Sequence, residues 1–152
     1  MEIKDILDKR IITTNLQVNT KEEAIYAMSS LLEKANYLSN KDLYIEDVFK
    51  REDEGKTGIG NYVAIPHGKS TGVNQIGVAI AINDKEIPWE SIDGQGVKII
   101  ILFAVGNDTE GAKQHLKVLS LFARKLGNDD IVNCLQEAKN PEDVINIFIK
   151  NE

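Results

Sequence analysis

Two histidines carry the chemistry that this chain can perform near neutral pH. Among its 152 residues, only His67 and His115 have imidazole side chains, which titrate near pH 7 and can act as nucleophiles or metal ligands. His67 stands between Pro66 and Gly68. Proline restrains the backbone and glycine permits a close approach or a sharp turn. We therefore expect His67 to project from the end of a short strand at Tyr62–Ile65, although a turn histidine bonded to a carbonyl is the alternative.

His115 lies in a stretch with helical periodicity. Leu119, Phe122 and Leu126 follow it at spacings that place all four residues on one face of a helix. The imidazole is thus expected on or beside the face that covers a sheet. It can be a core histidine with one satisfied nitrogen, or it can meet His67 near a helix N-terminus, where free amides and the dipole favour an anion. The spacing alone leaves both interpretations open.

Other catalytic motifs fit the sequence poorly. Gly55-Lys56-Thr57 resembles the end of a phosphate-binding loop, but Lys50 occupies the position that requires the first glycine. Gly58-Ile59-Gly60 lacks the third glycine of a dinucleotide-binding turn and precedes a strand. Neither the three ligands of a catalytic zinc site nor a serine nucleophile elbow is recognisable. Cys134 is expected to be a bystander in a short amphipathic helix. Because none of these motifs is complete, we expect no metal or cofactor.

The charge balance narrows the choice of partners. The 18 basic and 24 acidic residues give a net charge of −6, which argues against binding to nucleic acid or to anionic lipid. The single cysteine excludes an intramolecular disulfide. The longest apolar run, Ile99–Val105, is far shorter than the ~20 residues of a membrane helix. With no signal-peptide pattern at the N-terminus, a cytoplasmic location is expected.

The elements that would position the histidines follow from periodicity and capping residues. Helices are predicted from the capping box at Thr20–Glu23 to about residue 35, from Ser39 or Asn40 to before Gly55, from Asp108 or Thr109 to Gly127, over 131–138, and from Asn140 onward. Strands are predicted at 11–16, 62–65, 76–82 and 97–105, with a turn region and a short edge strand between the last two. Nearly continuous apolar strands indicate a sheet buried on both faces. We therefore predict one α/β domain, residues 1–152, with a mixed, mostly parallel sheet of about five strands and helices on both faces.

An ordered set of motifs resembles a known family. Arg51-Glu52 at the end of a helix precedes Thr57-Gly58-Ile59-Gly60 and Ala64-Ile65-Pro66-His67-Gly68, and later come Ile87-Pro88-Trp89, Asp93-Gly94, Val97 and His115-Leu116 with Leu119. This set is similar to the IIA domain of the fructose/mannitol class of the bacterial phosphoenolpyruvate-dependent sugar phosphotransferase system. The similarity extends from Ile11 through the last helix, and it also implies a mixed sheet flanked by helices.

The resemblance implies roles for particular residues. His67 would accept a phosphoryl group from the phosphocarrier HPr and pass it to a cysteine of a IIB partner, which in turn serves a membrane IIC permease. His115 would support the phosphorylated state, and Arg51 would lie near the site, although an ion pair with Glu52 or Glu54 is the alternative. The Thr57 hydroxyl and the amides of Gly58 or Gly68 are additional candidate donors to the phosphoryl oxygens.

Three functions remain open on the sequence alone. The first is phosphoryl transfer for sugar uptake, and the second is a regulatory phosphoprotein of the nitrogen-related branch that acts by binding other proteins. The third is a non-catalytic scaffold in which His67 is not phosphorylated. Lys56, Tyr62 and Gly106 depart from the residues common in the family. Because none of them is a histidine, these departures bear on the sugar and the partner more than on activity.

Overall fold

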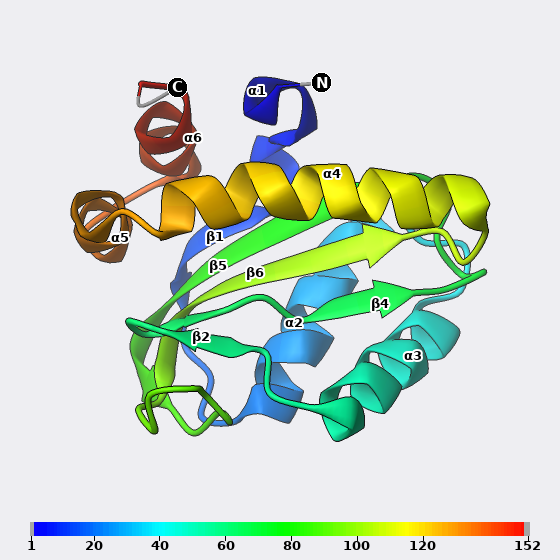
Figure 1. Cartoon of the computed structure of the whole chain (residues 1–152), viewed down its shortest axis with the longest axis horizontal. Coiled ribbons are helices and arrows are strands. Elements are labelled where there is room, and N and C mark those ends of the chain that lie inside the picture. The colour runs from blue at the N-terminus through cyan, green and yellow to red at the C-terminus, as the bar shows by residue number, and fades with distance from the viewer. Residues whose placement is uncertain (1, 151–152) are drawn as a thin grey trace.

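A mixed sheet lies at the centre of the computed structural model, which describes residues 2–150 (Figure 1). Its strands run in the order β1-β5-β6-β3-β2, and β4 also pairs with β6. The β5–β6 and β2–β3 pairings are antiparallel, whereas β1–β5, β3–β6 and β4–β6 are parallel. The strands are β1 (Ile12–Leu16), β2 (Gly58–Gly60), β3 (Val63–Ala64), β4 (His67–Lys69), β5 (Gly77–Ile87) and β6 (Val97–Val105). The predicted α/β class is confirmed.

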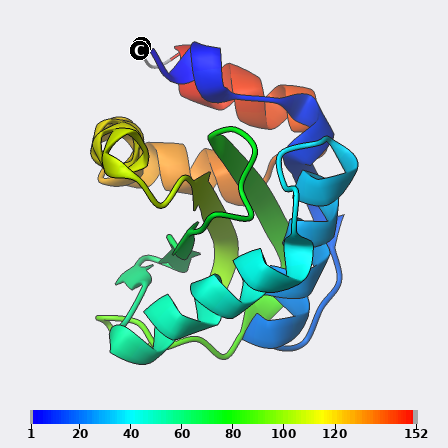
Figure 2. The same cartoon turned by 90° about the vertical axis from the view of Figure 1, so that its right-hand side faces the viewer.

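Helices cover both faces of this sheet (Figures 1 and 2). One core cluster joins α2 and α3 to one face, and a second joins α1, α4, α5 and α6 to the other. The helices are α1 (Ile3–Ile6), α2 (Lys21–Lys34), α3 (Lys41–Glu54), α4 (Thr109–Leu126), α5 (Asp129–Gln136) and α6 (Pro141–Lys150), with a 3-10 turn at Lys9–Ile11. Within residues 2–150, none of these helices has the length and apolar character to cross a membrane.

The capping residues explain why the long helices begin where predicted. The side chains of Thr20, Asn40 and Asp108 each accept a hydrogen bond from a backbone amide in the first turn of α2, α3 and α4. Only one half of the predicted capping box forms at Thr20. The Glu23 amide donates to the Thr20 hydroxyl, but the Glu23 carboxylate accepts from that hydroxyl at 3.4 Å and not from the Thr20 amide. Gly127 ends α4 with φ −74°, so it does not adopt the left-handed conformation typical of a glycine cap.

The region around the sheet edge differs most from the sequence prediction. β5 continues to Ile87 through the exposed residues Asp84–Glu86, which ended the predicted apolar run at residue 82. No edge strand forms at residues 88–96; a single bridge joins Ser91 to Gly58. The short strands β2 and β4 were not predicted, because strands of three residues that contain glycine have no detectable periodicity. Pairing partners far away in the sequence create them.

Gly68 permits a close contact between β4 and α3. A Cβ atom at this position would lie 2.7 Å from Val48 Cγ2 and 2.8 Å from Tyr44 Cε1. Of the two roles that the sequence left open for Gly68, the structure thus shows the close approach. We expect Gly68→Ala to lower the free energy of unfolding by about 1–3 kcal/mol, since a methyl group must displace packed side chains. Denaturant unfolding measures this change, and an unaltered midpoint would contradict the packing described here.

Candidate functional site

His67 is the first residue of β4, directly after a break in the sheet. β3 and β4 both pair with β6, with His67 opposite Phe103, and Ile65-Pro66 separates them. Pro66 has no amide proton for a sheet hydrogen bond, but its carbonyl still accepts one from the Phe103 amide at 3.0 Å. Beyond β4 no further strand of the described chain pairs. The histidine therefore lies at an open edge on a backbone held by the central strand.

His115 meets His67 across this edge. The two ring centroids lie 4.6 Å apart with the rings tilted by 40°, and the His115 ring also packs edge-on to Phe103 at 5.9 Å. His115 is 5% exposed and lies on the sheet-facing side of α4. It is nearly two turns from the start of that helix, and Asp108 caps the first turn. Of the two interpretations left open for His115, the structure thus shows the meeting of the two imidazoles, but the helix dipole contributes little because its effect fades beyond the first turn.

The ring nitrogens are not equivalent. Within the described chain, Nδ1 of His67 and Nε2 of His115 are buried and have no hydrogen-bond partner. His67 as a whole is only partly buried. An unsatisfied buried nitrogen on each ring indicates a site with unused hydrogen-bonding capacity, and with Nδ1 buried, Nε2 is the candidate nitrogen of His67 for an approaching group.

Both histidines are neutral at physiological pH. Burial, followed by the nearby His115, Arg51 and Lys69, lowers the pKa of His67 to about 4, against an opposing contribution from a hydrogen bond with the Ile65 backbone. Burial also lowers the pKa of His115, and Lys69 and Arg51 act in the same direction. A neutral imidazole retains the lone pair that a nucleophile requires.

This pKa gives a prediction for pH titration. Since the unfolded chain binds a proton at His67 near the ordinary value of 6.5 and the folded chain only near 4, the unfolded state takes up more protons between these values. His67 therefore contributes stability that is fully present above pH 6.5 and declines as the pH falls toward 4. NMR titration of the His67 ring should show a midpoint near pH 4, and a midpoint at or above 6.5 would contradict the burial and charge described.

Two cations act on the pair of histidines. Arg51 lies in the last turn of α3, where its Nη1 donates to the Gly55 carbonyl at 3.3 Å. Among the ion pairs formed by residues 2–150, none joins Arg51 to Glu52 or Glu54. Lys69 was not predicted as a site residue. Side chains alternate along a strand, so Lys69 falls on the same face of β4 as His67; because β4 could not be predicted, the sequence held no signal for this role.

The remaining candidate donors have other partners. Thr57 is 3% exposed, and its hydroxyl donates to the Glu52 carboxylate at 2.8 Å and accepts from Trp89 Nε1 at 2.9 Å. The Gly58 amide donates to the Glu90 carbonyl at 3.1 Å. Gly68 is a paired residue in the middle of β4. These contacts hold the loop that leads to His67.

Cys134 is exposed on α5, the helix on which the sequence placed it. Within residues 2–150 no group of three or more His, Cys, Asp or Glu side chains is arranged to hold a metal ion.

Comparisons with known proteins agree with this geometry. Residues 5–151 match the family described as "Phosphoenolpyruvate-dependent sugar phosphotransferase system, EIIA 2". The chain is 33% identical over its whole length to the fructose-specific EIIABC component of Bacillus subtilis, but it spans only 24% of that relative. A crystal structure of the nitrogen regulatory protein IIA-Ntr from Neisseria meningitidis superimposes with a TM-score of 0.86 at 32% identity, covering 96% of this chain and 98% of the other.

A third relative bears on the fold alone. A complex of enzyme IIA-mannitol with phosphorylated enzyme IIB-mannitol from Escherichia coli contains a chain that matches with a TM-score of 0.80 at 20% identity, covering 95% of this chain and 97% of that one. All three relatives carry the name of a IIA component or of a protein that contains one.

Proposed function

The chain belongs to the EIIA type 2 family of the phosphoenolpyruvate-dependent sugar phosphotransferase system, and from this we propose that it relays phosphoryl groups on His67. The observation that carries the proposal is the contact between the His67 and His115 rings, 4.6 Å apart at an open edge of the sheet. Residues 1–152 form one such IIA domain in this proposal, working in the cytoplasm without a metal or cofactor.

The transfer step uses Nε2 of His67 as the nucleophile. The Nε2 lone pair attacks the phosphorus of phospho-HPr, a nitrogen–phosphorus bond forms, and the bond to the donor histidine breaks with its electron pair returning to that ring. For Nε2 to offer this lone pair, the proton of neutral His67 must reside on Nδ1, the buried nitrogen. Such a loose transition state depends on positioning and on positive charge around the phosphoryl oxygens, and Arg51 and Lys69 supply that charge.

His115 supports the phosphorylated state through a hydrogen bond. Its ring lies beside His67 and has a buried nitrogen without a partner, so a neutral imidazole can donate one N–H to a phosphoryl oxygen. A phosphoryl dianion next to His115 also favours protonation of that ring. The hydrogen bond therefore strengthens as charge accumulates.

In the second half of the relay, the phosphoryl group passes to a cysteine of a IIB partner, which serves a IIC permease for sugar uptake. The B. subtilis relative is named as a fused EIIABC component, and the E. coli IIA-mannitol chain is named in complex with phosphorylated IIB. The segment that leads to His67 is held by hydrogen bonds of Thr57 and Gly58 and by the close packing of Gly68, so these three residues support the site without contacting the phosphoryl group.

A regulatory role is the second candidate. The similarity to IIA-Ntr from N. meningitidis, with a TM-score of 0.86 over 98% of that chain, favours it. In this case His67 is still phosphorylated, but the phosphoryl group governs binding to other proteins and is not passed to a IIB cysteine.

One reconstitution separates the two roles. The chain is incubated with phosphoenolpyruvate, enzyme I and HPr, and the phosphorylated form is isolated and mixed with purified IIB domains of the fructose and mannitol types. Transfer to the IIB cysteine supports sugar uptake, and stable retention on His67 favours the regulatory role. Failure to phosphorylate the chain at all would contradict both.

A further inference from the structure

Trp89 takes part in a buried polar network behind the histidine site. Its indole Nε1 donates to the Thr57 hydroxyl at 2.9 Å, and that hydroxyl donates its proton to Glu52. Glu52 also receives a hydrogen bond from Lys21 Nζ at 3.2 Å, although its side chain is only 4% exposed. A buried carboxylate is costly unless it is paired and hydrogen-bonded. The network satisfies Glu52 and fixes Thr57 at the same time.

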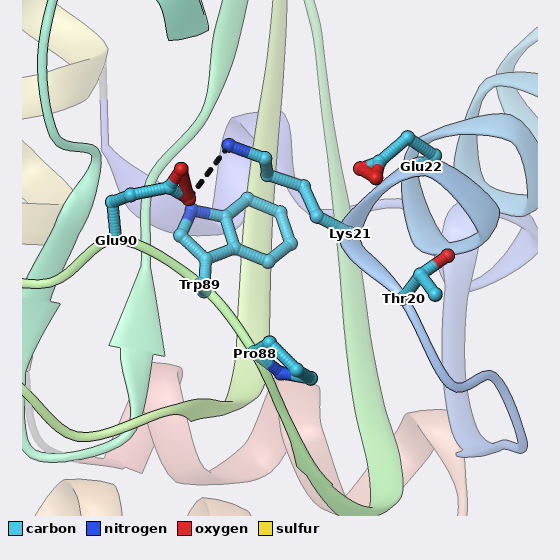
Figure 3. A pocket seen from close by; sticks show the side chains of 6 residues that line it. All are labelled: Thr20, Lys21, Glu22, Pro88, Trp89 and Glu90. Atoms are coloured by element: carbon cyan, nitrogen blue, oxygen red, sulfur yellow. Dashed lines mark hydrogen bonds and ion pairs between the residues drawn. The ribbon is translucent and has the colours of Figure 1, made fainter.

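Two residues of this network, Lys21 and Trp89, line a surface pocket of about 440 Å³ (Figure 3). The figure shows the Lys21 ammonium extending across the face of Trp89 toward Glu90; its nitrogen lies 5.6 Å from the ring centroid and 2.9 Å from the carboxylate oxygen. Lys21 is the first residue of α2, Glu52 is in the last turn of α3, and Trp89 lies in the loop after β5. Three distant segments thus converge on Thr57.

Thr57 in turn contacts the segment that carries His67. Its carbonyl accepts a hydrogen bond from the Ile65 amide at 2.9 Å, two residues before His67. The neighbouring Gly58 is held by the same loop as Trp89: its amide donates to the Glu90 carbonyl and its own carbonyl accepts from Ile92. A Cβ at Gly58 would lie 2.6–2.7 Å from atoms of Glu90 and Ser91, so the two segments pack too closely for a side chain at this position.

Glu52 connects the same network to the cation beside the histidines. It adjoins Arg51 in the last turn of α3, and Arg51 acts electrostatically on both imidazoles. The contacts that hold Glu52 therefore also hold the end of the helix that carries Arg51. The network is thus connected through Thr57 to the segment that carries His67 and through Glu52 to Arg51, whose positive charge acts on His67.

We propose that Lys21, Glu52 and Trp89 are positioning residues of the phosphoryl-transfer site, acting through Thr57 on the His67 segment and through α3 on Arg51. This inference rests on the proposed function of His67. It assigns the Thr57 hydroxyl to the network: the single hydroxyl proton is directed to Glu52 and is not free for a phosphoryl oxygen.

The test compares Trp89→Phe with a matched control, Tyr37→Phe. Trp89→Phe removes the indole donor and keeps an aromatic ring. Tyr37→Phe likewise removes one donor, the hydroxyl that bonds Asp8 at 2.7 Å, at a place outside the network. Phosphoryl transfer from phospho-HPr is measured per folded molecule, together with NMR titration of the His67 ring. A purely structural role would leave that titration unchanged.

We expect Trp89→Phe to lower kcat about tenfold with KM for phospho-HPr unchanged, because small displacements of reacting groups cost large factors in rate, and to shift the His67 titration midpoint. Tyr37→Phe should match the wild type in both. Wild-type kcat and titration in Trp89→Phe, or equal losses in the control, would overturn the inference. If the wild-type chain takes up no phosphoryl group, the proposed function fails, and the His67 titration still decides whether the network positions that ring.

Discussion

Replacement of His67 by glutamine is expected to abolish uptake of a phosphoryl group. Glutamine carries an amide near the position of Nε2, so the polar contacts of the sheet edge are largely retained, but an amide nitrogen has no lone pair available for attack on phosphorus. After incubation with phosphoenolpyruvate, enzyme I and HPr, intact-mass measurement should show the wild type gaining one phosphoryl group and His67→Gln gaining none.

The matched control for this variant is His115→Gln. It makes the same chemical change at the neighbouring ring, 4.6 Å away, and should still become phosphorylated, with the phosphoryl group mapping to the peptide that contains His67. Full labelling of His67→Gln would contradict the assignment of the nucleophile. Loss of labelling in both variants would mean that uptake of the phosphoryl group requires both rings, and it would not assign the nucleophile to His67 alone.

Removal of the hydrogen-bonding capacity of His115 is the second large expected effect. His115→Leu keeps a buried apolar side chain next to Phe103 but offers no donor, so we expect phosphoryl transfer to fall by about a hundredfold, the typical loss for one donor to a developing anion. His115→Gln, which retains an N–H group, should retain more of the rate. Rapid-quench measurement of transfer from phospho-HPr gives both values.

The order of these rates is the informative quantity. If wild type, His115→Gln and His115→Leu transfer at decreasing rates while all remain folded, His115 acts through its donor. Equal rates in all three would make His115 a core histidine, as its 5% exposure alone would allow.

Much of the fold could be predicted because its signals are local. Thr20, Asn40 and Asp108 each cap the helix that follows, as their side chains and the following apolar periodicity indicated. The nearly continuous apolar run at residues 97–105 is β6, the central strand, and its length and composition, apolar except for Lys98, suit a strand buried on both faces. The meeting of His67 and His115 was one of two interpretations, because the helix spacing gave the face of α4 but not its position over β4.

The rest depends on contacts between distant segments. The Thr57 hydroxyl was one candidate donor to a phosphoryl oxygen, but its hydrogen bonds to Glu52 and to Trp89, which is distant in the sequence, occupy it in a buried position. The charge of Lys69 reaches both histidines only because β4 pairs with β6 and α4 crosses above them. Local patterns carry no information about such pairings, so these residues emerge only from the folded chain.

The central claim, that Nε2 of His67 carries the phosphoryl group, is tested most directly by long-range 1H–15N correlation NMR of the phosphorylated protein. We predict that a single imidazole changes its spectrum to that of an Nε2-phosphorylated ring and that this ring is His67, whose Nδ1 is buried. A phosphoryl group on Nδ1, on His115 or on any other side chain would contradict the account.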